Sequence, residues 1–154
     1  MGRQTTTTYT EIKSEFFTLA ELTRSETAAR HKIDNTPSKA IIDNLQYGVD
    51  MVLDPLRRLY GQQIKINSGY RCEQLNKLVG GVSNSWHLKG NAADIHIESA
   101  EQAKILFANL QKLPSVDTVL FEHSKTAQWL HVQWDRSARN QHHYHYEGIN
   151  YLFH

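Results

Sequence analysis

The most informative segment of this chain is Ser85-Trp86-His87-Leu88-Lys89-Gly90-Asn91-Ala92-Ala93-Asp94. Gly90 predicts a turn, and the residues after it predict a strand over 92–97 with Asp94 on the face opposite to the isoleucines. His87 stands just before the turn, so the chain can fold back at Gly90 and bring its imidazole beside the carboxylate of Asp94. The segment therefore predicts a cluster of metal-ligating side chains where a turn meets a strand.

A second alternating segment is Trp129-Leu130-His131-Val132-Gln133-Trp134. Its apolar and polar residues alternate, so His131 lies on the face of the predicted strand that is opposite to the apolar set. If that face lies beside Asp94, two imidazoles and one carboxylate converge. Three protein ligands with a fourth position left for water are the usual arrangement at a catalytic zinc ion. We therefore expect His87, Asp94 and His131 to bind a metal ion.

The rest of the chain predicts helices and strands in mixed order. The longest helix is expected to start at Thr36-Pro37, to kink at Pro55 and to end before Gly61, because apolar residues recur there at helical spacing. Further elements are expected as helices from Leu19, over 73–79 and over 100–112, and as strands over 64–67, 92–97, 118–122 and 129–134. Because the order has no regular strand–helix alternation, the expected class is α+β.

Composition limits the classes of protein that fit this chain. Its 154 residues suit one domain, and 17 Lys and Arg against 16 Asp and Glu leave a net charge of +1. That balance argues against nucleic acid or a membrane as a partner. The single cysteine, Cys72, excludes an intramolecular disulfide and a cysteine-based zinc site. We expect a monomer, and the lack of an apolar run of signal-peptide or membrane-span length predicts a protein that is cytoplasmic as synthesised.

Several motifs, taken together and in order, resemble the M15 family of zinc peptidases. They are Ser68-Gly69-Tyr70-Arg71, Leu75-Asn76, Gly80-Gly81, Ser85-x-His87-x-x-Gly90-x-Ala92-x-Asp94 and Trp129-Leu130-His131-Val132. The likeness is closest to the D-Ala-D-Ala carboxypeptidase branch with its phage endolysin-like members. It implies a small antiparallel sheet flanked by helices, as in the hedgehog and D-Ala-D-Ala peptidase fold. The corresponding division of the chain is a polar segment over 1–16, a peptidase-like domain over 17–135 and a His/Tyr-rich tail over 136–154.

The resemblance also implies roles for individual residues. One zinc ion per chain is expected on the three ligands named above. Arg71 matches the arginine that steadies the substrate and the developing oxyanion, which suits a guanidinium with its fixed set of donors. Ser85 matches a residue near the metal that hydrogen-bonds a ligand or the substrate, although a turn-capping role fits it equally. Trp86 flanks the ligand segment and is expected to line the substrate cleft.

One position departs from the family pattern. Several branches place an acidic general base three residues before the last zinc ligand, and here that residue is Gln128. A carboxamide cannot accept the proton of an attacking water. Glu122 is the first candidate for this task, and His123 is the second because imidazole titrates near neutral pH.

Two functions from different classes follow. The first is a zinc-dependent peptidase that hydrolyses peptidoglycan stem peptides at the cell wall, with a phage or prophage origin as one interpretation. The second is a non-catalytic zinc-containing domain that binds a wall peptide or a protein partner, as in the hedgehog signalling domains, which resemble this family in their zinc site. Gln128 is the residue that keeps the second function open. A third alternative is a phage structural component that holds wall peptides.

Overall fold

The computed structural model describes residues 11–137 and 143–145. Its α-helices are α1 (Leu19–Thr23), α2 (Glu26–Arg30), α3 (Lys39–Gly48), α4 (Asp54–Tyr60), α5 (Glu73–Leu78) and α6 (Ala100–Leu110). Its strands are β1 (Ile66–Ser68), β2 (Ala92–His96), β3 (Val116–His123), β4 (Gln128–Trp134) and β5 (His143–His145). The expected α+β class is confirmed. Most of the predicted end segments, 1–16 and 136–154, lies outside the described residues.

The strands form one sheet in the order β1-β2-β4-β3-β5. The pairs β1–β2, β2–β4 and β3–β4 are antiparallel, as expected. The pair β3–β5 is parallel, and it aligns Val119 with Tyr144. Strand β5 was not predicted, because it is only three residues long and lies in a tail rich in His, Tyr and Asn that gave no clear indication of structure.

The longest helical stretch begins two residues later than predicted. The side chain of Ser38, not of Thr36, caps α3 by accepting a hydrogen bond from the amide of Ile41. A π-helical turn over Val49–Leu53 then separates α3 from α4. Pro55 therefore falls in the first turn of α4, where its missing amide hydrogen costs no helical hydrogen bond. The stretch ends at Gly61, which has a positive φ of 77°, as predicted.

The apolar core lies between the sheet and the helices α3, α4 and α6. Its members include Leu45, Val49, Leu53, Ile95, Leu106, Val119, Leu130, Val132 and Trp134. The Trp134 indole donates a hydrogen bond to the carbonyl of Asn44 over 3.1 Å and lies directly against Gly48, where any Cβ would overlap the ring. This packing fixes one face of β4 to the core and leaves its other face for the site.

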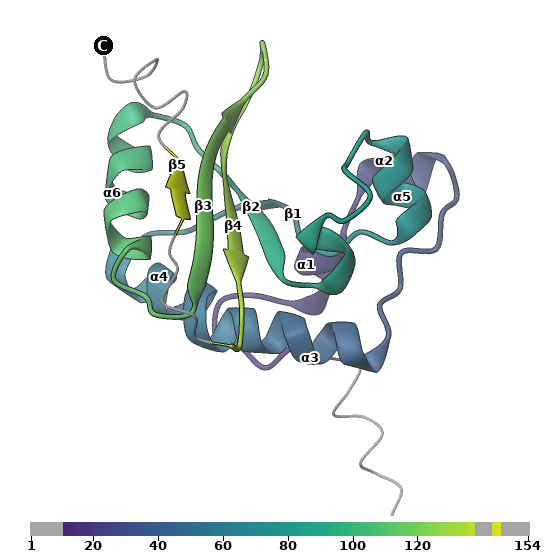
Figure 1. Cartoon of the computed structure of the whole chain (residues 1–154), viewed down its shortest axis with the longest axis horizontal. Helices are drawn as coiled ribbons and strands as arrows, with labels where there is room; N and C mark the ends of the chain where they lie inside the picture. The colour runs from purple at the N-terminus through teal and green to yellow at the C-terminus, as the bar shows by residue number, and fades with distance from the viewer. Residues whose placement is uncertain (1–10, 138–142, 146–154) are drawn as a thin grey trace, which may run out of the picture.

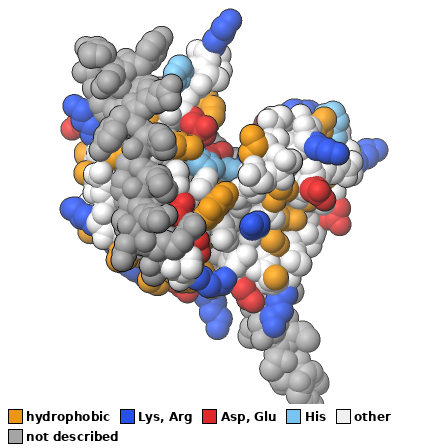
Figure 2. Space-filling view, in the orientation of Figure 1, with side chains coloured by type: hydrophobic (Ala, Val, Ile, Leu, Met, Phe, Trp, Pro, Cys, Tyr) orange, Lys and Arg blue, Asp and Glu red, His pale blue; other side chains and the backbone are white. Residues whose placement is uncertain are grey.

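The short helices α1, α2 and α5 form a separate group beside β1, which we call the helical lobe (Figure 1). The sheet and the helical lobe stand on two sides of a hollow in the surface, and histidine side chains lie at its base (Figure 2). Within the described part of the chain, no helix is both long enough and apolar enough to cross a bilayer.

Candidate metal centre

Strand pairing brings Asp94 and His131 together. The antiparallel register of β2 and β4 sets Asp94 directly opposite His131. Oδ1 of Asp94 and Nδ1 of His131 are 2.9 Å apart. The alternation read from residues 129–134 is thus realised, with Leu130 and Val132 in the core and His131 on the side of the hollow.

His87 reaches the same point from a short turn of 3₁₀ helix over Trp86–Lys89. The hydroxyl of Ser85 caps this turn by accepting a hydrogen bond from the amide of His87 over 3.2 Å. The turn ends at Gly90, whose φ of 75° belongs to the left-handed region that favours glycine. The fold-back at Gly90 places Nε2 of His87 3.3 Å from Oδ1 of Asp94.

The three side chains offer one ligand atom each, and these atoms all lie within 4.8 Å of one another. His87 is 1% exposed and His131 is 9% exposed. A pair of imidazole nitrogens with one carboxylate oxygen is a donor set that suits zinc. The residues predicted from the sequence are therefore the ones that the fold brings together.

Hydrogen bonds on the far side of each imidazole fix which nitrogen faces Asp94. Nδ1 of His87 lies 2.6 Å from the carbonyl oxygen of Gly69, and Nε2 of His131 lies 2.8 Å from Oε1 of Gln133. A carbonyl oxygen only accepts, so in neutral His87 the proton is on Nδ1 and Nε2 presents its lone pair to Asp94. Outer partners of this kind orient the histidine ligands of metal sites.

The positions of the imidazole protons indicate whether a cation fits between His87, Asp94 and His131. In neutral histidine only one ring nitrogen bears a proton, yet both nitrogens of each imidazole face oxygen atoms here. The lone pairs of two neutral imidazoles directed at one carboxylate would repel it. A cation between the three ligand atoms removes that repulsion, so the donor set fits a divalent metal.

The pKa shifts of Asp94 and His131 in the absence of a metal also indicate that the cluster favours a bound positive charge. Burial acts to raise the pKa of Asp94, but hydrogen bonds from His131 and His87 outweigh it and hold that pKa well below the usual range. Burial acts to lower the pKa of His131, but its hydrogen bond to Asp94 prevails and raises that pKa. The cluster thus attracts positive charge, either a proton or a metal ion that displaces it.

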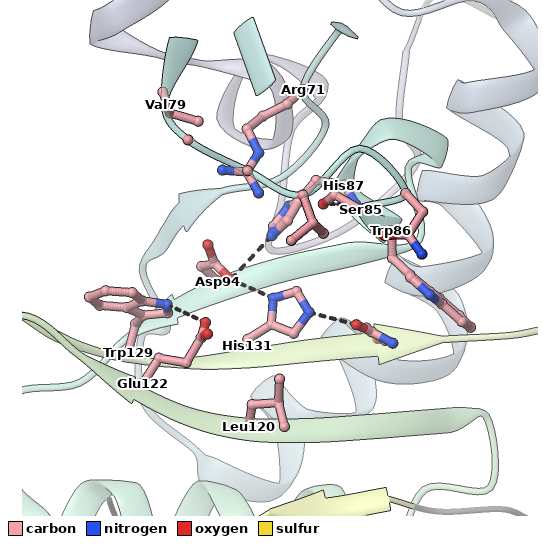
Figure 3. A pocket seen from close by; sticks show the side chains of 15 residues that line it. Arg71, Val79, Ser85, Trp86, His87, Asp94, Leu120, Glu122, Trp129 and His131 are labelled. Carbon is pink, nitrogen blue, oxygen red and sulfur yellow. Dashed lines mark hydrogen bonds and ion pairs between the residues drawn. The ribbon is translucent and has the colours of Figure 1, made fainter. Parts of the chain in front are cut away.

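A cavity of about 590 Å³, which we call the metal cavity, opens over these ligands. Strands β2, β3 and β4 form one wall, and the opposite wall is Arg71 with the segment from Val79 to His87 (Figure 3). The guanidinium of Arg71 points toward Asp94 across the cavity (Figure 3). Burial lowers the pKa of Arg71, while the nearby Asp94 and Glu122 act to raise it. Nε of Arg71 is buried and has no hydrogen-bond partner in the described part of the chain.

The segment that carries Arg71 is held from three directions. Its own amide donates to the carbonyl of His87 over 3.1 Å, which ties it to the metal ligands. The side chain of Asn35 accepts from the amide of Cys72 over 2.8 Å and donates to the carbonyl of Tyr70 over 3.0 Å. Gly69 lies so close to the carbonyl of Leu22 that a Cβ there would overlap it. Sequence reasoning missed Asn35, because no motif marks a residue that acts through backbone groups far along the chain.

Of the two candidate bases, only Glu122 lines the metal cavity. Its Oε1 accepts a hydrogen bond from the indole nitrogen of Trp129 over 2.9 Å (Figure 3). His123 lies on the other face of β3, where its ring centroid is 6.2 Å from that of Phe121. The structure therefore does not support His123 as the base, because successive residues of a strand point to opposite faces.

The alternation of side chains along a strand also explains why Gln128 does not line the metal cavity. The residues of β4 that line the metal cavity are Trp129, His131 and Gln133, whereas Gln128 lies among the hairpin residues 123–128. An offset of three residues along a strand reverses the face. In this structure the side chain at position 128 does not line the metal cavity.

The two remaining predicted residues, Ser85 and Trp86, both line the metal cavity. Ser85 is 8% exposed, and its hydroxyl caps the turn that carries His87. The turn-capping alternative for Ser85 is therefore the contact that the structure contains. Trp86 borders the cavity (Figure 3).

Replacing Gln133 with alanine is expected to lower zinc affinity by about 10- to 100-fold, the usual effect of removing an outer partner of a histidine ligand. The reason is that Nε2 of His131 loses the acceptor that orients its ring. Competition with a chromophoric chelator measures the change. Gln128→Ala, on the other face of the same strand, is the matched control and is expected to keep the affinity of the unaltered chain. Equal affinity in both variants would remove Gln133 from the site.

Comparison with known proteins agrees with this geometry. A family model described as Peptidase M15 matches residues 15–133, which include every residue assigned to the site. Among curated proteins, the comparison finds no significant match.

Proposed function

Because the chain belongs to the peptidase M15 family, we propose that it is a zinc-dependent peptidase that hydrolyses amide bonds in bacterial peptidoglycan peptides, of the D-Ala-D-Ala carboxypeptidase or endopeptidase type. The observation that carries the proposal is the meeting of His87, Asp94 and His131 at the base of a cavity that Arg71 also lines. Its site of action would be the cell wall, with one zinc ion per chain.

The zinc ligands and Arg71 have different roles in the proposed reaction. Zinc on His87, Asp94 and His131 would supply a water of lowered pKa, roughly 7 in zinc enzymes, and would polarise the scissile carbonyl. Arg71 donates its N–H groups to the carbonyl oxygen and stabilises the negative charge that develops there during attack. The contacts of Asn35 and His87 with the backbone around Arg71 keep the guanidinium in place.

Glu122 acts as the general base. Its carboxylate accepts a proton from the attacking water and returns it to the nitrogen of the leaving amine. The hydrogen bond from Trp129 holds one carboxylate oxygen and leaves the other free to accept that proton. Trp86 and Val79, which both line the metal cavity, supply apolar contact for the peptide on either side of the scissile bond.

An assay on purified muropeptides tests the proposal. The zinc-loaded chain is expected to release a new amine, which mass spectrometry of the products assigns to a particular bond. Chelation is expected to stop the reaction, and added zinc is expected to restore it. Zinc retained at one per chain with no turnover on any wall peptide would favour the alternative of a non-catalytic binding domain.

A further inference from the structure

Asn76 lies behind the wall of the metal cavity that faces the strands. Part of that wall is formed by residues 79–82, which follow α5 directly and which we call the wall loop. Asn76 belongs to α5, is 2% exposed and does not itself line the cavity. A polar side chain buried at such a place needs partners, and those partners are in the wall loop.

Three contacts join Asn76 to the wall loop. Its backbone carbonyl accepts a hydrogen bond from the amide of Gly81 over 2.8 Å, and its Nδ2 donates one to the carbonyl of Val82 over 2.8 Å. Its side chain also lies against Gly81, where any Cβ would overlap Oδ1 of Asn76. The φ of Gly81 is outside the left-handed region, so this contact, and not the backbone conformation, is what favours glycine there.

The same hydrogen bonds continue to a metal ligand. The carbonyl of Val82 also accepts from the amide of Ser85 over 3.1 Å. The hydroxyl of Ser85 accepts from the amide of His87 over 3.2 Å. Asn76 is therefore the inner end of a chain of hydrogen bonds that runs through the wall loop to the turn that carries His87.

The wall loop is the part of the cavity with the most accessible apolar side chains. Val79 is 42% exposed and Val82 is 66% exposed, and both line the metal cavity. Between them Gly80 and Gly81 have no side chain, so the backbone of a bound peptide can approach the loop closely. The position of the loop thus determines how a peptide fits between it and the strands.

We propose that Asn76 is a positioning residue, which holds the wall loop in place and thereby contributes to substrate binding. This inference rests on the proposed peptidase function for the nature of the substrate. The hydrogen bond from Nδ2 to the carbonyl of Val82 carries the effect, because Oδ1 has no hydrogen-bond partner in the described part of the chain. Asn76 acts through the loop and does not touch the reacting atoms.

The variant Asn76→Ala is expected to raise the KM for a wall peptide by about 10-fold, the effect of one lost buried hydrogen bond, with kcat and zinc content near those of the unaltered chain. Asn109→Ala is the matched control. It removes a buried asparagine of α6 that accepts a hydrogen bond from Lys112 and lies outside the metal cavity, so KM is expected to stay the same. An unchanged KM in Asn76→Ala, with a Tm lowered as in the control, would leave Asn76 with a structural role alone and overturn the proposal.

The contact with Gly81 gives a second, independent test. Gly81→Ala is expected to raise KM by a similar factor, because the new Cβ displaces the Asn76 side chain from the carbonyl of Val82. In the Asn76→Ala chain the overlapping atoms are gone, so Gly81→Ala is expected to cause no further rise. Effects on KM that multiply in the double variant would show that the two residues act independently, against the proposal.

Hydrogen exchange separates this inference from the proposed function. In the Asn76→Ala chain the amide protons of residues 81–87 are expected to exchange about 10-fold faster, while those of α6 keep their rates. Unchanged rates over 81–87, or an equal increase throughout the chain, would overturn the positioning role. A local increase in a chain that binds and cuts no wall peptide would support the positioning of the loop and count against the peptidase alone.

Discussion

Replacing His131 with alanine is expected to remove zinc and turnover together. His131 is one of three ligand residues, and two remaining side chains cannot hold a zinc ion firmly in an open coordination site. Without the metal, the pKa of the attacking water returns from roughly 7 toward 15.7, so turnover should fall by more than about 1000-fold. Zinc content by atomic absorption and turnover on wall peptides measure the two losses on one preparation.

His123→Ala is the matched control for that experiment. It removes an imidazole from the neighbouring strand, but from the face that does not line the metal cavity. Zinc content and turnover are both expected to stay near those of the unaltered chain. Circular dichroism checks that both variants fold. A His131→Ala chain that folds, keeps its zinc and cuts peptides would contradict the assigned ligand set.

Replacing Glu122 with glutamine is expected to lower kcat by about 10²- to 10⁴-fold, the usual contribution of a general base. Glutamine keeps the shape of the side chain and an oxygen that accepts the hydrogen bond of Trp129, but it cannot take a proton at neutral pH. Zinc content is expected to remain unchanged, because Glu122 is not among the clustered ligand residues. Steady-state kinetics with a zinc assay on the same sample separates these effects.

The variant Gln128→Glu is the control for the assignment of Glu122 as the general base. Gln128→Glu restores the acidic residue of other family branches, yet its side chain belongs to the face of β4 away from the metal cavity. Adding it to the Glu122→Gln chain is therefore expected to give no recovery of turnover. Full turnover in the Glu122→Gln chain would reject Glu122 as the base, and recovery through Gln128→Glu would show that the hairpin rearranges during the reaction.

The sequence was informative where local periodicity determines the structure. Alternation along 92–97 and 129–134 predicted two strands and the faces of Asp94 and His131, and the fold pairs these residues directly. Gly90 predicted the turn that returns His87 to the strand. Each of these inferences needs only the period of a strand or the conformational freedom of a glycine.

Other parts of the site depend on contacts between distant segments, and these were not predicted. The carbonyl of Gly69 lies 18 residues from His87 along the chain, and the amide of Cys72 lies 37 residues from the Asn35 side chain. The periodicity of apolar residues along the sequence does not indicate contacts between residues so far apart. Arg24 and Lys65 are a similar case, because they line one cavity with Arg71 only when α1 packs beside β1.

The predicted and observed starts of the longest helical stretch differ for a local reason. Thr36 and Ser38 both precede helical residues and both suit a cap, so the choice between them depends on where the backbone enters the helix. Gln128 was identified from motif spacing, which does not indicate which face of a strand a side chain occupies. Once β4 is known, the spacing itself assigns Gln128 to the opposite face.

Anomalous diffraction at the zinc edge from crystals of the zinc-loaded chain shows whether His87, Asp94 and His131 hold the metal ion. One anomalous peak is expected between Nε2 of His87, a carboxylate oxygen of Asp94 and Nδ1 of His131, at distances of about 2.0–2.2 Å, with Arg71 across the cavity. A peak at other residues, or no peak in crystals of a chain that retains zinc in solution, would contradict it.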